Sequence, residues 1–151
     1  MESLVSTWRA AAKPWSPADA YVLVEALLIT KAYELLLDRL SNIYKYGLIP
    51  RQRDVECLLR GFRDQCSSAS TSSNSSETAQ TPEDSRMQAL DNCYKTFGVA
   101  LYHHIAPTQE MYIDLIIAGL RTGTEEGRRR STVTRGEAMS LGFHVPELDE
   151  L

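Results

Sequence analysis

Apolar residues recur along most of this chain at intervals of three and four positions, which is the spacing of one face of an α-helix. The longest such pattern runs from residue 17 to residue 46, and its charged residues gather on the opposite side of the second half. Ser16 and Pro17 have the residue types of an N-terminal cap and a first helical position, and Gly47 has that of a helix stop. We therefore expect a single long helix from Pro17 to Tyr46.

The first half of this expected helix is apolar on nearly all sides. Leu23 and Leu27 point in directions that the second half occupies with charged side chains, and a helix of this kind is buried on several sides. A short amphipathic stripe that contains Trp8 and Trp15 precedes it. Either that stripe folds back over the two leucines, or the four residues form an interface with a partner or with a second copy of the chain.

Three further segments show helical spacing, and they cover residues 50–66, 82–105 and 108–120. Thr81 supplies an N-cap for the second of them, followed by a proline at the first helical position. Pro107 ends or kinks that helix. We find neither the alternating pattern of a β-strand nor an internal repeat, so the pattern predicts helices alone.

Two segments lack a continuous helical pattern. Residues 66–81 are rich in serine and threonine and cannot bury enough apolar surface to order themselves, which predicts a flexible low-complexity loop. Residues 122–151 contain glycines and a run of arginines, which favours a looser C-terminal tail with a short helix over residues 134–141. The predicted fold is all-α: a single-domain bundle over residues 1–151, with about five helices around the long central helix.

Length and charge narrow the class of protein. With 151 residues, of which 43% are hydrophobic, the chain is long enough for one domain with a substantial core. It carries 20 acidic and 16 basic residues, for a formal net charge of -4. That balance provides no general attraction to phosphate backbones or to anionic lipid, so broad nucleic-acid binding is disfavoured.

The sequence also indicates a compartment. No basic segment followed by an apolar core begins the chain, as it would in a secretory signal. Asp19, Glu25 and Lys31 interrupt the most apolar stretch, and a membrane span needs about 20 predominantly apolar residues. The three cysteines lack metal-type spacing and fit reduced thiols. We expect an intracellular protein, cytoplasmic or nuclear, without a membrane span.

Two adjacent histidines, His103 and His104, raise the question of a metal or catalytic site. On a helix they point about 100° apart, whereas helical zinc ligands are usually four residues apart. We interpret the pair as the end of a helix; a pH-sensitive contact and a metal-dependent hydrolase built with Glu110 are the alternatives. No phosphate loop, dinucleotide fingerprint or nucleophile elbow occurs. We therefore expect no catalysis, no cofactor and no metal.

The arginine-rich segment is the other candidate for specific chemistry. Ser131 and Thr132 follow three consecutive arginines, an arrangement similar to substrates of basophilic kinases. The segment is otherwise a solvated charge run or a patch that contacts an anion or a nucleic acid. The candidate contacts are Arg121, Arg128, Arg129, Arg130 and Arg135.

These observations favour a non-catalytic helical module for protein–protein interaction or assembly, which binds a protein partner or a second copy of itself. A small regulatory protein, or a viral structural or accessory protein, would fit; the viral suggestion rests only on compactness and on missing motifs. The alternative is a nucleic-acid-associated factor that uses the arginine-rich C-terminal segment.

Overall fold

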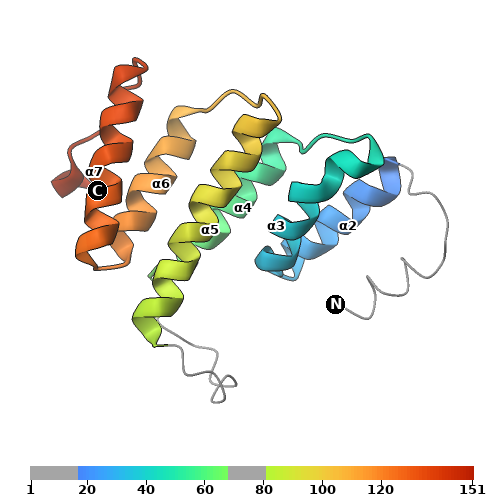
Figure 1. Cartoon of the computed structure of the whole chain (residues 1–151), viewed down its shortest axis with the longest axis horizontal. Coiled ribbons are helices and arrows are strands. Elements are labelled where there is room, and N and C mark those ends of the chain that lie inside the picture. The colour runs from blue at the N-terminus through green and yellow to red at the C-terminus, as the bar shows by residue number, and fades with distance from the viewer. Residues whose placement is uncertain (1–16, 68–80) are drawn as a thin grey trace.

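A computed structural model describes residues 17–67 and 81–151 (Figure 1). These residues form six α-helices and two short 3-10 helices and contain no β-strand, so the predicted all-α fold is confirmed with one helix more than expected. The helices are α2 (Pro17–Ile29), α3 (Tyr33–Asn42), η1 (Ile43–Tyr46), α4 (Gln52–Gln65), α5 (Pro82–Tyr102), α6 (Gln109–Arg121), α7 (Glu125–Ser140) and η2 (Leu148–Glu150).

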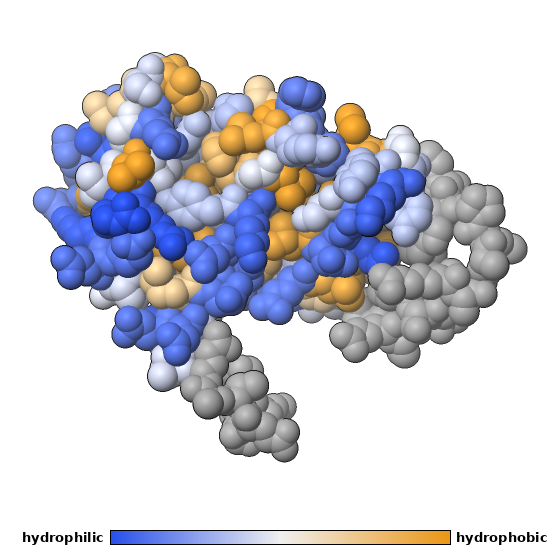
Figure 2. Space-filling model, viewed as in Figure 1, coloured by the Kyte–Doolittle hydropathy of each residue, from blue (hydrophilic) through white to orange (hydrophobic). Residues whose placement is uncertain are grey.

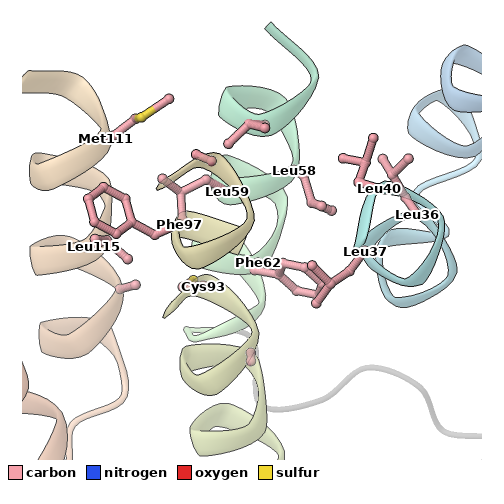
Figure 3. Close-up of a cluster of buried hydrophobic side chains, with 14 of the residues drawn as sticks. Leu36, Leu37, Leu40, Leu58, Leu59, Phe62, Cys93, Phe97, Met111 and Leu115 are labelled. Atoms are coloured by element: carbon pink, nitrogen blue, oxygen red, sulfur yellow. The ribbon is translucent and has the colours of Figure 1, made fainter. Parts of the chain in front are cut away.

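The helices stand side by side in a row, with α7 and α6 at one end and α3 and α2 at the other (Figure 1). Helices α4 to α7 alternate in direction along the chain, and α5 lies in front of α4. The core fills the space between α3, α4, α5 and α6 (Figure 3). Its fully buried large side chains include Leu36, Leu40, Leu58, Leu59, Phe62, Leu90, Met111, Leu115 and Ile116.

The expected single helix from Pro17 to Tyr46 is wrong, because the chain breaks it between α2 and α3. Lys31 adopts the left-handed conformation, with a φ of 58°. The amide of Lys31 donates to the carbonyl of Leu28 at 3.2 Å, and that of Ala32 donates to the carbonyl of Leu27 at 3.0 Å. This pair of bonds is the Schellman stop, which closes a helix at a left-handed residue. The central element of the bundle is α4 instead, which contacts α2, α3, α5 and α6.

A charge cluster around one buried carboxylate joins α2 to the start of α4. Asp54 is fully buried and accepts hydrogen bonds from Arg51 at 2.7 and 3.1 Å. Arg51 also pairs with Glu25 of α2 at 3.1 Å, and its guanidinium lies 4.4 Å from the ring centre of Tyr21. Charged groups removed from water need partners of this kind, so the cluster sets the position of α2.

The expected looser tail over residues 122–151 is also wrong, because a full helix, α7, occupies much of it. Thr124 caps α7 by accepting a hydrogen bond from the amide of Gly127 at 2.9 Å. Gly127 is not a helix breaker here: a Cβ atom on it would collide with the carbonyl oxygen of Gly119 in α6. These two glycines let α6 and α7 approach closely. The short helix that we expected over residues 134–141 corresponds to the end of α7.

Some predictions lie outside the described residues. They are the amphipathic stripe with Trp8 and Trp15, the cap at Ser16, and residues 68–80 of the serine- and threonine-rich loop. At the loop's end the prediction holds: Thr81 accepts a hydrogen bond from the amide of Asp84 at 3.1 Å and caps α5.

Candidate functional site

An open groove runs between α3, with its continuation η1, and α5. Figure 2 shows hydrophobic surface gathered in the middle of this face, between those elements, with hydrophilic surface around much of it. We call this feature the α3–α5 groove. Its lining residues are Leu37, Ser41, Tyr44, Lys95, Gly98, Val99, Tyr102 and His103.

Each wall of the α3–α5 groove is one stripe of a helix. Lys95, Val99 and Tyr102 are spaced by four and three residues along α5, and the α3 wall has the same spacing from Leu37 to Tyr44. The rings of Tyr44 and Tyr102 lie 6.4 Å apart at one end of the groove. Because Tyr44 is 50% exposed and Tyr102 71% exposed, these two aromatic side chains remain available to a partner.

Three charged residues at the α3–α5 groove form no ion pair within residues 17–67 and 81–151. Lys95 is exposed and has no ion-pair partner among residues 17–67 and 81–151. Glu34 and Asp38 are exposed on α3, three residues before Leu37 and Ser41 respectively, which places them along the rim of the opposite wall. Within the described part of the chain neither acid forms an ion pair. The groove therefore has a basic wall and an acidic rim, both available.

Gly98 lies exposed on α5 in the α3–α5 groove, and no packing within residues 17–67 and 81–151 requires a glycine there. A Cβ atom on Gly98 would meet nothing within 4 Å. By contrast, one on Gly61 would lie 2.5 Å from the ring of Tyr33. A glycine inside a helix is less favourable than alanine by about 1 kcal/mol. That cost has no compensation in the described structure, whereas close approach of another backbone would explain it.

The two histidines end α5, as the sequence predicted. His104 is the left-handed residue, with a φ of 60°, and its amide donates to the carbonyl of Leu101 at 3.1 Å. The amide of Ile105 donates to the carbonyl of Ala100 at 2.9 Å, which completes a second Schellman stop. His103 packs edge-on against the ring of Tyr102 at 5.1 Å. Among the described residues no cluster of three or more histidine, cysteine or acidic side chains could hold a metal ion.

The five arginines of the expected anion patch are all engaged with acidic residues of the same chain. The N···O pairs are Arg121 with Asp64 at 3.1 Å, Arg128 with Asp149 at 3.4 Å, Arg129 with Glu126 at 2.6 Å, Arg130 with Asp91 at 2.7 Å, and Arg135 with Glu147 at 3.2 Å. The hydrogen bonds from Arg129 and Arg130 lower the pKa of the Glu126 carboxyl to about 2. The positive charge of these arginines is thus largely balanced by neighbouring carboxylates.

The two candidate phosphorylation sites differ in access. Ser131 is fully buried, and its hydroxyl donates to the carbonyl of Ile116 in α6 at 2.7 Å. Thr132 is exposed on α7, and its hydroxyl donates to the carbonyl of Arg128 at 3.0 Å. A kinase would therefore meet Thr132 at the surface, whereas Ser131 is accessible only if α6 and α7 separate. Modification of either residue stays a prediction.

The candidate interface leucines lie in the core. Leu23 is 4% and Leu27 0% exposed, in the cluster that also contains the leucines of α3. The chain turns back at Lys31, so α3 covers a side of α2 that a continuous helix would have left open. A role of Trp8 and Trp15 in an interface stays a prediction, because both lie outside the described residues.

Two buried ionisable groups, Cys93 and Asp114, have pKa values shifted by their surroundings. A hydrogen bond with Cys66, together with burial, raises the pKa of the Cys93 thiol well above its ordinary value, which favours the protonated thiol over the thiolate. Burial raises the pKa of Asp114, although Arg63 donates to its carboxylate at 2.6 Å and opposes that effect. These side chains join α4 to α5 and to α6.

Comparison with protein-family models, with curated proteins and with solved structures finds no match for this chain. Of the helices in residues 17–67 and 81–151, none combines the length and the apolar character that crossing a membrane requires.

Sequence reasoning missed the α3–α5 groove. The helical spacing over residues 82–105 did not show which side of α5 stays exposed: Leu101 is 47% exposed, whereas Leu90, Cys93 and Ala100 are buried. A usable signal was the second stripe of α5. Tyr102 lies seven residues after Lys95, and therefore on the same side of the helix as this charged residue. An aromatic residue on a polar face is a sign of binding only once its exposure is known.

Proposed function

We propose that this chain is a non-catalytic interaction module that assembles with protein through the α3–α5 groove. The observation that carries the proposal is an open apolar surface with two exposed tyrosines, beside a lysine without an ion-pair partner in the described residues. Aromatic side chains dominate the energetics of many protein interfaces, because they bury a large area with little loss of conformational freedom.

The shape of the groove favours a helical segment as its occupant. Two neighbouring helices form its walls, and a helix with its own apolar stripe fits between such walls with side chains spaced by three and four residues. Nucleic acid is the weaker candidate, because phosphate binding depends on available cations. The arginines that would provide them are paired with acids on the chain.

Site-specific photo-crosslinking in cells tests this proposal. A photo-reactive amino acid replaces Ser41 in the groove, and in a matched control it replaces Thr132, which is exposed on α7. We expect a protease-sensitive cross-linked product from position 41 and little from position 132. Absence of a protein adduct at position 41, or an adduct removed by nuclease, would contradict the proposal.

A further inference from the structure

We infer that the occupant of the α3–α5 groove is the same groove of a second copy, so that α3 and α5 of two chains form a four-helix bundle. This inference rests on the proposed function and names the partner. It replaces the self-association surface expected at Leu23 and Leu27, which are buried within one chain.

The residues of the two walls lie at matching heights. Helices α3 and α5 run in the same direction across the molecule (Figure 1), and Tyr44 and Tyr102 meet at one end of the groove. Leu37 and Lys95 each precede their tyrosine by seven residues. Lys95 lies roughly 10 Å below Tyr102 at 1.5 Å per residue, and Leu37 about 11 to 12 Å below Tyr44, because Tyr44 lies in the 3-10 helix η1, which rises about 2 Å per residue. The two are therefore nearly level.

A two-fold axis parallel to the helices makes this face complementary to itself. Rotation about such an axis lays α3 of one copy against α5 of the other and keeps every residue at its own height. Tyr44 of one chain then meets Tyr102 of the second. Val99 of both chains then faces the centre, as apolar residues do in four-helix bundles, and Leu37, which is only 8% exposed within one chain, lines the groove beside it.

The charges favour the same arrangement. At the height of Lys95, the α3 wall carries Asp38 on its rim, with Glu34 one turn further down. When α3 of the second copy lies against α5, these acids face Lys95, and the symmetry repeats the contact on the other side. An arrangement with the second copy inverted would bring Lys95 to the tyrosine end instead and leave the acids without a basic partner.

Gly98 gives the close approach that this packing needs. It lies on α5 between the levels of Lys95 and Tyr102, with open space where a Cβ would stand. A glycine at a helix contact lets a neighbouring helix come nearer than any other residue allows. We expect a weak association, with a dissociation constant on the order of micromolar, so that the fraction of dimer depends on concentration.

Sedimentation equilibrium of charge-reversed variants of the full chain tests the inference. Lys95→Glu sets acid against acid, and Glu34→Lys with Asp38→Lys sets base against base. We expect the wild type to rise from its chain mass of 16.9 kDa towards twice that value with concentration, and each variant alone to dissociate at least about tenfold more readily. In an equimolar mixture the two variants should associate again, because each supplies the charge that the other lacks.

A second pair of variants separates packing from charge. Gly98→Leu should abolish association, whereas Gly136→Leu should leave it unchanged, since Gly136 is equally exposed on α7 with nothing within 4 Å of its Cβ position. Circular dichroism verifies that both variants remain folded.

The outcomes distinguish this inference from the proposed function. A wild type that stays at 16.9 kDa up to millimolar concentration, or a mixture of charge-reversed variants that fails to associate, overturns the dimer. If photo-crosslinking at position 41 then captures a protein of another mass, the groove remains an interaction surface and only its occupant is different. If it captures nothing, both fail.

Discussion

The α6–α7 pair and the α3–α5 pair use the same residue types in opposite ways. Between α6 and α7, Gly119 and Gly127 bring the two backbones into contact, and the arginines of α7 have acidic partners. Between α3 and α5, Gly98 faces open space and Lys95 has no ion-pair partner within the described residues. The contact between α6 and α7 is closed to solvent, whereas the groove between α3 and α5 leaves apolar side chains exposed to solvent.

The difference shows that a glycine or a cation indicates function only when its own chain does not already explain it. A glycine that separates two packed helices serves folding, and a cation balanced by a neighbouring carboxylate has little attraction left for a partner. At the α3–α5 groove, Gly98 and Lys95 both lack such an explanation among the described residues. The predictions below test whether the two pairs differ as described.

Introducing a charge at neighbouring positions of α7 should give the largest contrast. Ser131→Glu places a carboxylate in the sealed contact with α6, and we expect it to lower the free energy of unfolding by about 3 kcal/mol or more. Thr132→Glu lies on the exposed side and should change it by less than about 0.5 kcal/mol. Urea unfolding followed by circular dichroism measures both. Equal effects would show that the α6–α7 contact is not sealed.

Adding a methyl group to a glycine should change the free energy of unfolding in opposite directions in the two pairs of helices. A Cβ on Gly119 would lie 2.5 Å from the carbonyl oxygen of Gly127, so Gly119→Ala should destabilise the protein by about 2 kcal/mol. Gly98→Ala should stabilise the monomer by about 0.5 to 1 kcal/mol, since it gains helix propensity without a collision. Thermal unfolding at low protein concentration compares them. A destabilised Gly98→Ala monomer would mean that the groove is packed internally.

The stops of α5 and α7 offer a smaller test. Gly142 ends α7 in the left-handed conformation, with a φ of 91°. At the end of α5 the left-handed residue is His104 instead. Gly142→Ala should cost about 1 kcal/mol, whereas His104→Gly should stabilise by about 0.5 kcal/mol, because only glycine adopts this conformation without strain. Chemical unfolding of both variants gives the answer. Loss of association in folded His104→Gly would return the histidines to consideration as functional groups.

The smallest effect concerns pH. Hydrogen bonds from Arg129 and Arg130 hold the pKa of Glu126 at about 2, below its ordinary value of 4.5. Since the folded-state pKa is lowered, the stabilisation is present above pH 4.5 and is lost as the pH falls through about 2. Unfolding free energy should therefore fall less with acidification in Glu126→Gln than in wild type. Glu125→Gln, its exposed neighbour, serves as the control and should behave like wild type.

The sequence predicted α5 and α4 best, the first from a cap and a pattern and the second from the pattern alone. Thr81 and its following proline located the start of α5, and the spacing after residue 50 located α4. The break at Lys31 escaped prediction because no glycine or proline marks it and the apolar spacing continues across it, since both helices bury their stripes in one core. The helix α7 escaped because its glycines resemble helix breakers until Gly119 is seen opposite Gly127.

The candidate site was less predictable than the fold, for a physical reason. Whether Lys95 or Arg130 is available depends on acids that approach from other helices, and Asp91 lies 39 residues before Arg130. Periodicity within one helix carries no information about such partners. It also cannot show that the rings of Tyr44 and Tyr102 lie close together, because α4 and the segments before and after it separate η1 from α5 along the chain.

Hydroxyl-radical footprinting across a concentration series tests the central claim most directly, because it reports the exposure of individual side chains in the unmodified protein. The account predicts that labelling of Tyr44 and Tyr102 falls as the mass rises. Labelling of Met139 and Leu141, which are 49% and 62% exposed at the end of α7, should stay constant. Association that protects Met139 and Leu141 while both tyrosines remain labelled would contradict the claim that the α3–α5 groove is the contact surface.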